Sequence, residues 1–240
     1  MAKPPSLKQR IRDGELLIGV AVPMDATRSQ IEGILARDDY AYISTDSQHA
    51  AYDEERLIQF CSIAQELGVH VQFRIKHTHL AFLVGNYLDL GPTGVEVPQV
   101  EDAATVAQAV DYFYYPQTGR RSWGGAARWG FSGQDRLEYA EWWNNTGVLW
   151  MQIESLHAVT HAARLARSGV DCLSWGPADL QFDIEAHAHH PLQSDDECVR
   201  HVLQQLEGTG VRLAYRNFTP DLRNKYIDMG VTVLLERPKE

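Results

Sequence analysis

The chain has 240 residues, 44% of them hydrophobic and 22% charged, which is typical of a globular protein that buries a sizeable core. Its longest uninterrupted apolar runs, such as Leu16 to Val22, are far shorter than the roughly 20 residues that a membrane span needs, so no membrane partner is expected. The formal charge of −10 would repel a phosphate backbone, which argues against a nucleic-acid partner.

The cysteines and the first residues bear on the compartment. Cys61, Cys172 and Cys198 are odd in number, form no Cys-x-x-Cys pair and do not stand at metal-ligand spacing from a histidine. The basic start of the chain is not followed by the small-residue cleavage signature of a secretion signal. Both observations favour a soluble protein of the reducing cytoplasm.

Eight short apolar or β-branched runs alternate with amphipathic helical stretches along the chain. The runs are Leu17–Val22, Ala41–Thr45, Val69–Ile75, Gly94–Val97, Val148–Ile153, Val170–Trp175, Arg212–Tyr215 and Val231–Leu235. Between them, Glu54–Leu67 has apolar residues at helical spacing and ends at Gly68, a typical residue just after a helix.

Strands that are apolar on both faces need cover on both sides, which indicates a parallel sheet. Eight such units in this length predict a closed (β/α)8 TIM barrel, formed by residues 1–240 as a single domain. An open, doubly wound sheet is the alternative. Its dinucleotide-binding version loses support because Gly19 is followed by Val-Ala-Val-Pro and not by a Gly-x-Gly-x-x-Gly turn.

Two segments depart from the regular repeat. The stretch from Tyr115 to Asn145 is long and rich in Gly, Arg and Trp, and we expect it to be an ordered active-site loop. After the eighth run only a short segment remains, so we expect the eighth helix of the barrel to be absent. We therefore expect the outer face of the eighth and first strands, including Leu234 and Val20, to be bare unless neighbouring subunits or the segment Ser6–Arg12 cover it.

Polar residues gather just after several of the predicted strands, where the catalytic groups of this fold lie. They are Asp46, Gln48 and His49 after the second run, Arg74 and His77 after the third, Glu154 after the fifth, and Gly176-Pro177-Ala178-Asp179 after the sixth. Carboxylates, an arginine and a histidine at one end of the barrel predict a divalent-metal and oxyanion site. A guanidinium at the end of a buried strand is costly unless it meets carboxylates or an anionic ligand.

The single residues also have simpler interpretations. Glu154 and Asp179 could each stand at the start of the following helix, where the helix dipole favours an acid. A lone loop histidine such as His49 is usually solvated.

Two further groups are predicted to have no catalytic role. His187, His189 and His190 match no closed metal-site pattern, so we expect them to be exposed to solvent. The aromatic run Tyr112 to Tyr115 is expected to pack in the core or against a subunit.

Taken in this order, the segments resemble the HpcH/HpaI class II pyruvate aldolases, which cleave or form 4-hydroxy-2-oxo acids. The resemblance spans nearly the whole chain. It rests on Asp46-Ser-Gln-His49, Phe73-Arg74, Tyr87-Leu-Asp-Leu-Gly91 with Val97-Pro-Gln-Val100, Tyr115-Pro116 with Gly119-Arg-Arg-Ser122, Gln152-Ile-Glu154 and Gly176-Pro-Ala-Asp-Leu180.

The resemblance implies a cofactor and a metal site. Glu154 and Asp179 would hold a divalent ion, Mg²⁺ or Mn²⁺ with Co²⁺ as a further option. Pyruvate or another 2-oxo acid would complete the coordination sphere, and an aldehyde would be the second substrate.

The resemblance also implies roles for residues around the metal. Arg74 would share the enolate charge, and His49, oriented by Asp46, would transfer protons. Asp89 would reach the site of a neighbouring subunit in a homo-oligomer. Gln152 and the residues Gly176, Pro177 and Ala178 would bind the substrate, with backbone amides near a helix start holding its carboxylate.

The sequence departs from the family pattern at several positions. Gln48 replaces a glutamate, Ala50 replaces a proline or small residue, Ser122 replaces a glycine, and the loop after the first strand reads Val22-Pro23-Met24 where a glycine is common. Two alternatives therefore stay open: a non-catalytic or regulatory oxo-acid-binding barrel, and a decarboxylase or CoA-thioester lyase on the same scaffold.

Overall fold

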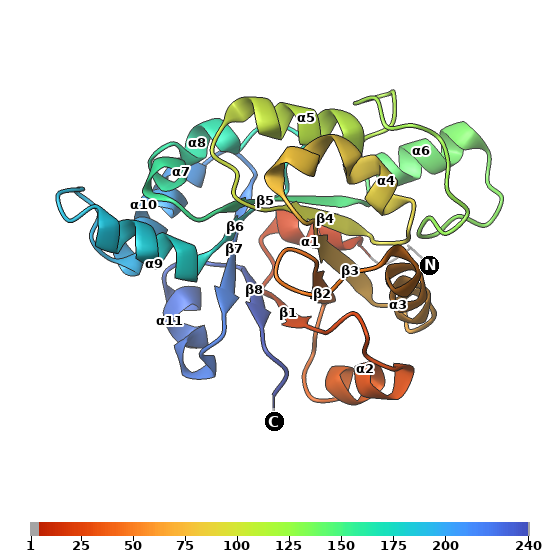
Figure 1. The fold of residues 1–240 in the computed structure, drawn as a ribbon, viewed down its shortest axis with the longest axis horizontal. Coiled ribbons are helices and arrows are strands. Elements are labelled where there is room, and N and C mark those ends of the chain that lie inside the picture. Colours follow the sequence, from red (N-terminus) through yellow and green to blue (C-terminus); the bar gives the residue numbers. More distant parts are fainter. Residues whose placement is uncertain (1–4, 240) are drawn as a thin grey trace.

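The computed structural model describes residues 5–239 and contains a closed barrel of eight parallel strands in chain order (Figure 1). The strands are β1 (Leu17–Ala21), β2 (Tyr42–Asp46), β3 (His70–Arg74), β4 (Gly94–Val97), β5 (Val148–Ile153), β6 (Cys172–Trp175), β7 (Arg212–Asn217) and β8 (Val233–Glu236). Each lies where the sequence predicts a strand, with ends shifted by no more than two residues. The predicted TIM barrel is confirmed.

The helices lie around the barrel (Figure 1). They are α1 (Leu7–Asp13), α2 (Arg28–Leu35), α3 (Glu54–Glu66), α4 (Val84–Leu88), α5 (Ala103–Phe113), α6 (Arg136–Asn144), α7 (Leu156–Thr160), α8 (Ala162–Leu165), α9 (Pro177–Ala186), α10 (Asp195–Leu206) and α11 (Arg223–Asp228), with 3₁₀ turns at Thr78–Leu83 and Pro220–Leu222. Several begin at a Ser or Asp whose side chain accepts from the first turn, as Asp53 does for α3 and Ser155 for α7.

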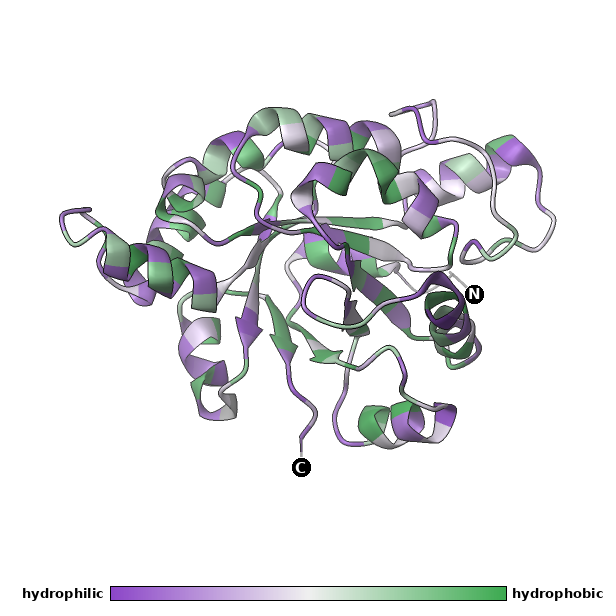
Figure 2. Cartoon of the chain, viewed as in Figure 1, coloured by the Kyte–Doolittle hydropathy of each residue, from purple (hydrophilic) through white to green (hydrophobic). Residues whose placement is uncertain are grey.

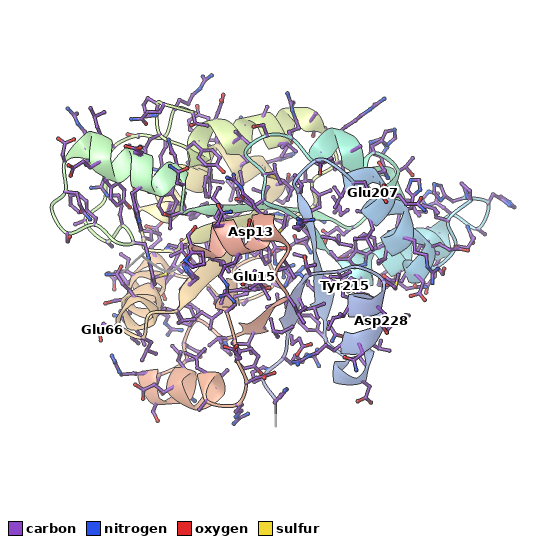
Figure 3. All side chains as sticks on the ribbon, turned by 180° about the vertical axis from the view of Figure 1, so that it is seen from behind. Asp13, Glu15, Glu66, Glu207, Tyr215 and Asp228 are labelled. Carbon is purple, nitrogen blue, oxygen red and sulfur yellow. The ribbon has the colours of Figure 1, made fainter. Side chains whose placement is uncertain are left out.

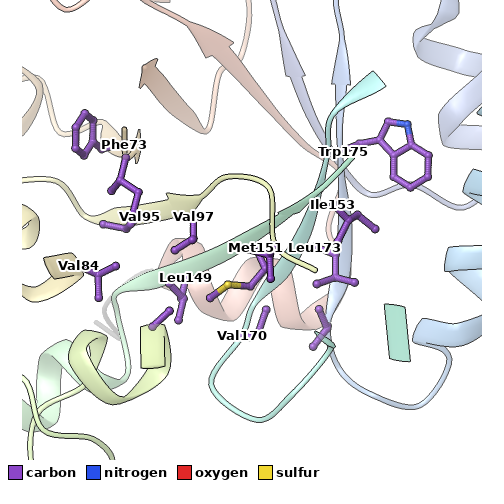
Figure 4. Packing of buried hydrophobic residues seen from close by; sticks show 14 of the residues in the cluster. Phe73, Val84, Val95, Val97, Leu149, Met151, Ile153, Val170, Leu173 and Trp175 are labelled. Atoms are coloured by element: carbon purple, nitrogen blue, oxygen red, sulfur yellow. The ribbon is translucent and has the colours of Figure 1, made fainter. Parts of the chain in front are cut away.

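Two apolar layers follow from the alternation of side chains along each strand. Outward-facing residues such as Val95, Leu149 and Leu173 pack beneath the helices (Figure 4). A separate cluster fills the interior of the barrel, where Tyr42 and Trp150 meet edge to face with ring centroids 5.4 Å apart. The interior layer is therefore largely apolar, with polar side chains such as Arg74 and Glu96 near the carboxyl ends of the strands.

Helix α1 closes the amino-terminal end of the barrel (Figure 3, where Asp13 marks its end). Its Leu7 and Ile11 belong to the interior cluster. Between them, Lys8 is 1% exposed and donates hydrogen bonds from Nζ to Tyr114 Oη, the Gly147 carbonyl and Asp171 Oδ2, at 2.7, 2.7 and 2.8 Å. The mouth at the carboxyl ends is therefore the open end.

The expected bare strip beside β8 is wrong. No helix follows β8 within the described chain, which ends at Lys239, yet Leu234 and Val20 are both 0% exposed and belong to the cluster that contains Ile31 of α2 and Tyr226 of α11. Polar contacts bridge the same gap. Arg223 of α11 pairs with Asp38 at 3.0 Å and with Glu236, and Lys239 pairs with Asp38 at 2.6 Å.

The segment between α5 and β5 also lies elsewhere than expected. It leads from the end of α5 to the start of β5, at the amino-terminal end of the barrel, where Tyr114 Oη contacts Lys8 and the carbonyl of Gly169. It is therefore not a loop over this chain's own mouth. Phe113, Tyr114 and Tyr115 are buried in the core, as predicted.

Two surface expectations can be compared with the structure. His187 and His189 are exposed and His190 is partly exposed, in a hydrophilic loop that projects between α9 and α10 (Figure 2). Within residues 5–239, no helix is both long and apolar enough to cross a membrane.

Candidate active site

Arg74 is held in a fixed orientation at the mouth of the barrel. It is the last residue of β3, and Asp46, its register partner, is the last residue of β2. Arg74 Nε and Nη2 donate to the two carboxylate oxygens of Asp46 at 2.8 and 2.7 Å, and Nη1 donates to Gln152 Oε1 at 3.2 Å. Burial alone would raise the pKa of Asp46, but the hydrogen bonds and charge of Arg74 lower it. The pair is therefore ionised and rigid.

His49 is not oriented by Asp46 in the way that the resemblance implies. The carboxylate of Asp46 accepts from the backbone N–H groups of Gln48 and His49, at 2.8 and 3.4 Å, and also accepts from the guanidinium of Arg74. Among the described residues, the imidazole of His49 has no hydrogen bond to Asp46, and the side chain is exposed beside the mouth. Asp46 therefore orients Arg74 and the turn that carries His49.

Glu154 is a buried carboxylate without protein partners. It follows β5 directly, is 7% exposed, and neither of its carboxylate oxygens has a hydrogen-bond partner among the described residues. Ser155 is the N-cap of α7, so Glu154 does not cap that helix. Burial, and then the nearby charge of Asp179, raises the pKa of Glu154 to about 7. Such an acid is stable only with a cation or a proton.

Gly176 makes room beside Glu154. A Cβ atom at this position would lie 2.3 Å from Glu154 Oε2 and 2.9 Å from Gln152 Nε2. Any larger residue would therefore displace the carboxylate. Asp179, on the first turn of α9, lines the same cavity of about 460 Å³ as Glu154.

The residues fit a divalent cation. Carboxylate oxygens are the ligands that Mg²⁺ and Mn²⁺ prefer. Four carboxylates of this region, Asp46, Glu96, Glu154 and Asp179, face two guanidinium groups, Arg74 and Arg216, which leaves two negative charges uncompensated. Among the residues described, no three His, Cys, Asp or Glu side chains are grouped to hold a metal, so substrate and water oxygens would supply the remaining ligands.

The segment Gly176–Ala178 offers fewer amides than expected. The N–H of Gly176 donates to the carbonyl of Ile153 at 3.1 Å, and Pro177 has no N–H. Pro177 is the first residue of α9, so the free donors at this helix start belong to Ala178 and Asp179.

Sequence reasoning missed a second ion pair at the mouth. Arg216 lies near the end of β7, and its Nη2 donates to Glu96 Oε2 of β4 at 2.5 Å. Ser174 Oγ of β6 donates to Glu96 Oε1 at 2.6 Å. The sequence does contain a signal for it, because Arg216 follows the predicted strand Arg212–Tyr215 directly, as Glu154 follows Val148–Ile153.

Two of the sequence candidates lie outside this cluster. Asp89 follows α4 and precedes β4, at the amino-terminal end of the barrel, and accepts from Arg121 Nη2 at 2.8 Å. Burial raises its pKa despite the charge of Arg121. His77 is the N-cap of the first 3₁₀ turn, and its Nδ1 accepts from the backbone of His79.

A second cavity, of about 570 Å³, adjoins the Asp46 side of the mouth. Its wall is largely apolar and includes Val22, Met24, Ala50 and Ala51. One cavity has Asp46 in its wall and the other has Glu154 and Asp179, so the two cavities adjoin different sides of the cluster.

The fold and this cluster define the class of the protein: a (β/α)8 barrel with an arginine and an acid pair at the carboxyl ends of its strands. A model of the HpcH/HpaI aldolase/citrate lyase family matches residues 35–215, three quarters of the chain. The chain belongs to this family.

Individual relatives agree with that assignment. The 2-keto-3-deoxy-L-rhamnonate aldolase of Escherichia coli O6:K15:H31 is 25% identical over 229 residues, which cover 93% of this chain and 83% of the relative. An HpcH/HpaI aldolase from Desulfitobacterium hafniense DCB-2 superimposes with a TM-score of 0.83 at 26% identity, covering 97% of this chain and 90% of that one. A family protein from Burkholderia cenocepacia J2315 gives a TM-score of 0.80 at 26% identity, covering 96% and 92%. The protein is an aldolase, a carbon–carbon lyase.

Proposed function

We propose that the protein is a divalent-metal-dependent aldolase that forms and cleaves 4-hydroxy-2-oxo acids through the enolate of pyruvate or a related 2-oxo acid. The observation that carries this proposal is Glu154, a buried carboxylate with two unpartnered oxygens beside Asp179. The relative named as a 2-keto-3-deoxy-L-rhamnonate aldolase supports a 2-oxo acid as substrate.

Glu154 and Asp179 would hold the metal, which is Mg²⁺ or Mn²⁺, with Co²⁺ as a further option. When bound, the ion would polarise the keto group and stabilise negative charge on its oxygen. Arg74, fixed by Asp46 and Gln152, would donate a hydrogen bond to that oxygen. The N–H groups of Ala178 and Asp179 at the start of α9 would hold the substrate carboxylate.

His49 would move the proton at the aldehyde oxygen. It is exposed beside Asp46 and the largely apolar cavity, where an aldehyde chain would lie. Gln152 orients Arg74 and stands next to Gly176, so it would position the 2-oxo acid.

The test is exchange of the pyruvate methyl protons with deuterated water, followed by NMR with and without Mg²⁺. We expect metal-dependent exchange that Asp179→Asn abolishes and that Glu185→Gln, which removes a charge from the exposed part of the same helix, leaves intact. Calorimetry with Mn²⁺ should show that Asp179→Asn binds far more weakly.

Two results would contradict the proposal. Unchanged Mn²⁺ affinity in Asp179→Asn would remove Asp179 from the metal site. A protein that binds pyruvate but never exchanges its protons would instead be the non-catalytic oxo-acid-binding barrel.

We also propose a homo-oligomer of single-domain subunits in the cytoplasm. Phe182 is 75% exposed and lines the cavity of Glu154 and Asp179, so a second copy covering it would shield the site from water. Asp89 lies far from its own mouth, and a role for it would need an adjacent subunit. Light scattering that gives the mass of one chain would rule out the oligomer.

The cysteines support the cytoplasm as the compartment. All three are free and buried, which suits a reducing compartment.

A further inference from the structure

The pair Glu96–Arg216 crosses the barrel interior beneath the mouth. Glu96 is 0% exposed and lies beside Arg74 in the strand register, whereas Arg216 comes from β7, three strands further round the barrel. Ser174 on β6, the strand next to β7, is also bonded to Glu96, so the network connects β4, β6 and β7.

Stability does not explain this pair. Apolar residues such as Trp150, Ala214 and Leu235 fill the barrel directly below it. Replacing a buried ion pair by well-packed apolar residues is often neutral or stabilising, because desolvation offsets the Coulomb attraction. A charged pair at this depth of the barrel, next to Arg74, therefore points to a task in the site.

Arg216 has N–H groups without a protein acceptor. Arg74 gives Nε and Nη2 to Asp46 and Nη1 to Gln152, which leaves the second N–H of each terminal nitrogen for the keto oxygen. Arg216 gives Nη2 to Glu96, while its buried Nε has no partner among residues 5–239. The side chain is 10% exposed at the carboxyl end of β7, so it is reached from the mouth.

The position of Arg216 indicates which part of a substrate it would meet. Its positive charge acts on both Asp46 and Glu154, the acids on either side of the reaction centre. It lines neither of the two cavities that flank this centre. Because its partner Glu96 is the register neighbour of Arg74, a group that reaches Arg216 would belong to the 2-oxo acid bound at the centre.

We propose that Arg216, held by Glu96, binds a second carboxylate on the carbon chain of the 2-oxo acid, so that the preferred nucleophile is a 2-oxo dicarboxylic acid. This inference rests on the proposed function and narrows its substrate class. A planar guanidinium with open N–H groups suits a carboxylate, and the two charges of a divalent ion offset the excess negative charge of the site.

The experiment compares 2-oxoglutarate with its 5-methyl ester, an open-chain analogue whose distal group carries no charge. Proton exchange at C3 is followed by NMR with Mg²⁺, and binding is measured by calorimetry. Pyruvate exchange is recorded in each variant as the internal reference. We expect the parent to favour the acid over the ester by about tenfold or more, the range of a hydrogen bond to a charged group.

The variants separate specificity from folding. Arg216→Leu should abolish the preference. The double variant that combines Glu96→Leu and Arg216→Leu should abolish it too, and it should be as stable as the parent because apolar side chains refill the interior. Arg120→Leu is the matched control, because it removes an exposed arginine paired with Asp111 and should keep the preference.

The outcomes are distinct. Equal handling of the acid and the ester by the parent, or a preference that survives in the double variant, would overturn the inference while pyruvate exchange still supported the aldolase. Absence of pyruvate exchange in the parent would instead refute the proposed function, and this inference with it.

Discussion

Replacing Lys8 by Met should destabilise the whole barrel, because it leaves a buried carboxylate without its cation. The Asp171 side chain is 0% exposed, and its Oδ2 accepts from Lys8 Nζ and from the backbone of Leu149 at 2.8 and 2.9 Å. Its Oδ1 has no hydrogen-bond partner among the described residues, and Arg12 lies 3.6 Å away. Burial lowers the pKa of Lys8, although Asp171 opposes that effect, so the ammonium is held at a cost.

The size of the effect follows from these contacts. Removing one partner of a buried pair costs about 3–5 kcal/mol. For a chain of this size, each kcal/mol lowers Tm by about 2–4 °C, so the loss corresponds to about 6–20 °C. In Lys8→Met with Asp171→Leu, both charges are gone, and most of the loss should be recovered.

Denaturant unfolding measures these free energies, and Arg10→Met is the matched control. Arg10 lies on the same helix in an exposed pair with Glu15, which is worth less than about 1 kcal/mol. A loss below about 1 kcal/mol in Lys8→Met, or a double variant as unstable as the single one, would refute the reasoning that α1 is fixed to the barrel by this pair.

Three other predictions concern the mouth and the gap beside β8. Arg74→Lys should slow pyruvate proton exchange about 10²- to 10³-fold, because an ammonium cannot reproduce the fork that addresses Asp46 and the keto oxygen together; an unchanged rate would exclude the role. Gly176→Ala should weaken Mn²⁺ binding by displacing the Glu154 carboxylate, whereas Gly33→Ala, which has open space around it, should not; equal calorimetric affinities would contradict this. Asp38→Asn should lower Tm at neutral pH. Lys239 and then Arg223 lower the pKa of Asp38 to about 2, so its contribution is present above about pH 4, the ordinary range of the group, and is lost as the pH falls through 2. An undiminished difference in Tm at pH 2 would argue against this reasoning.

The sequence was sufficient for the architecture because strand periodicity is a local property. Each apolar run is short and bounded by turn residues, and a regular alternation of eight such runs fits few folds. The same logic placed Arg74 and Glu154 at the mouth, since residues at the ends of parallel strands meet at one end of a barrel. The hydrogen-bond partners of these residues could not be predicted in the same way. Asp46 was expected to orient the imidazole of His49, but it accepts from Arg74.

The composition of a segment does not show at which end of the barrel it lies. The segment from Tyr115 to Asn145 has the composition of a binding loop, but it connects a helix to the next strand. Such connections lie at the amino-terminal end of the strands in a (β/α)8 barrel, so its arginines could not reach this chain's own mouth. Arg121 and Arg128 instead stack on aromatic rings of the same region, at 4.8 Å from Tyr115 and 4.0 Å from Trp123.

The number of helices does not determine whether the residues beside β8 are buried. With one covering helix for each strand, a missing eighth helix would leave Leu234 and Val20 exposed to water. Burial depends on side chains and not on the number of helices, and the neighbouring α2 and α11 extend the core over these residues. Arg223, which contacts both Asp38 and Glu236, then connects α11 to the loop after α2. Sequence periodicity identifies such helices, but it does not show that long side chains on them span the gap, because that contact joins residues 185 positions apart.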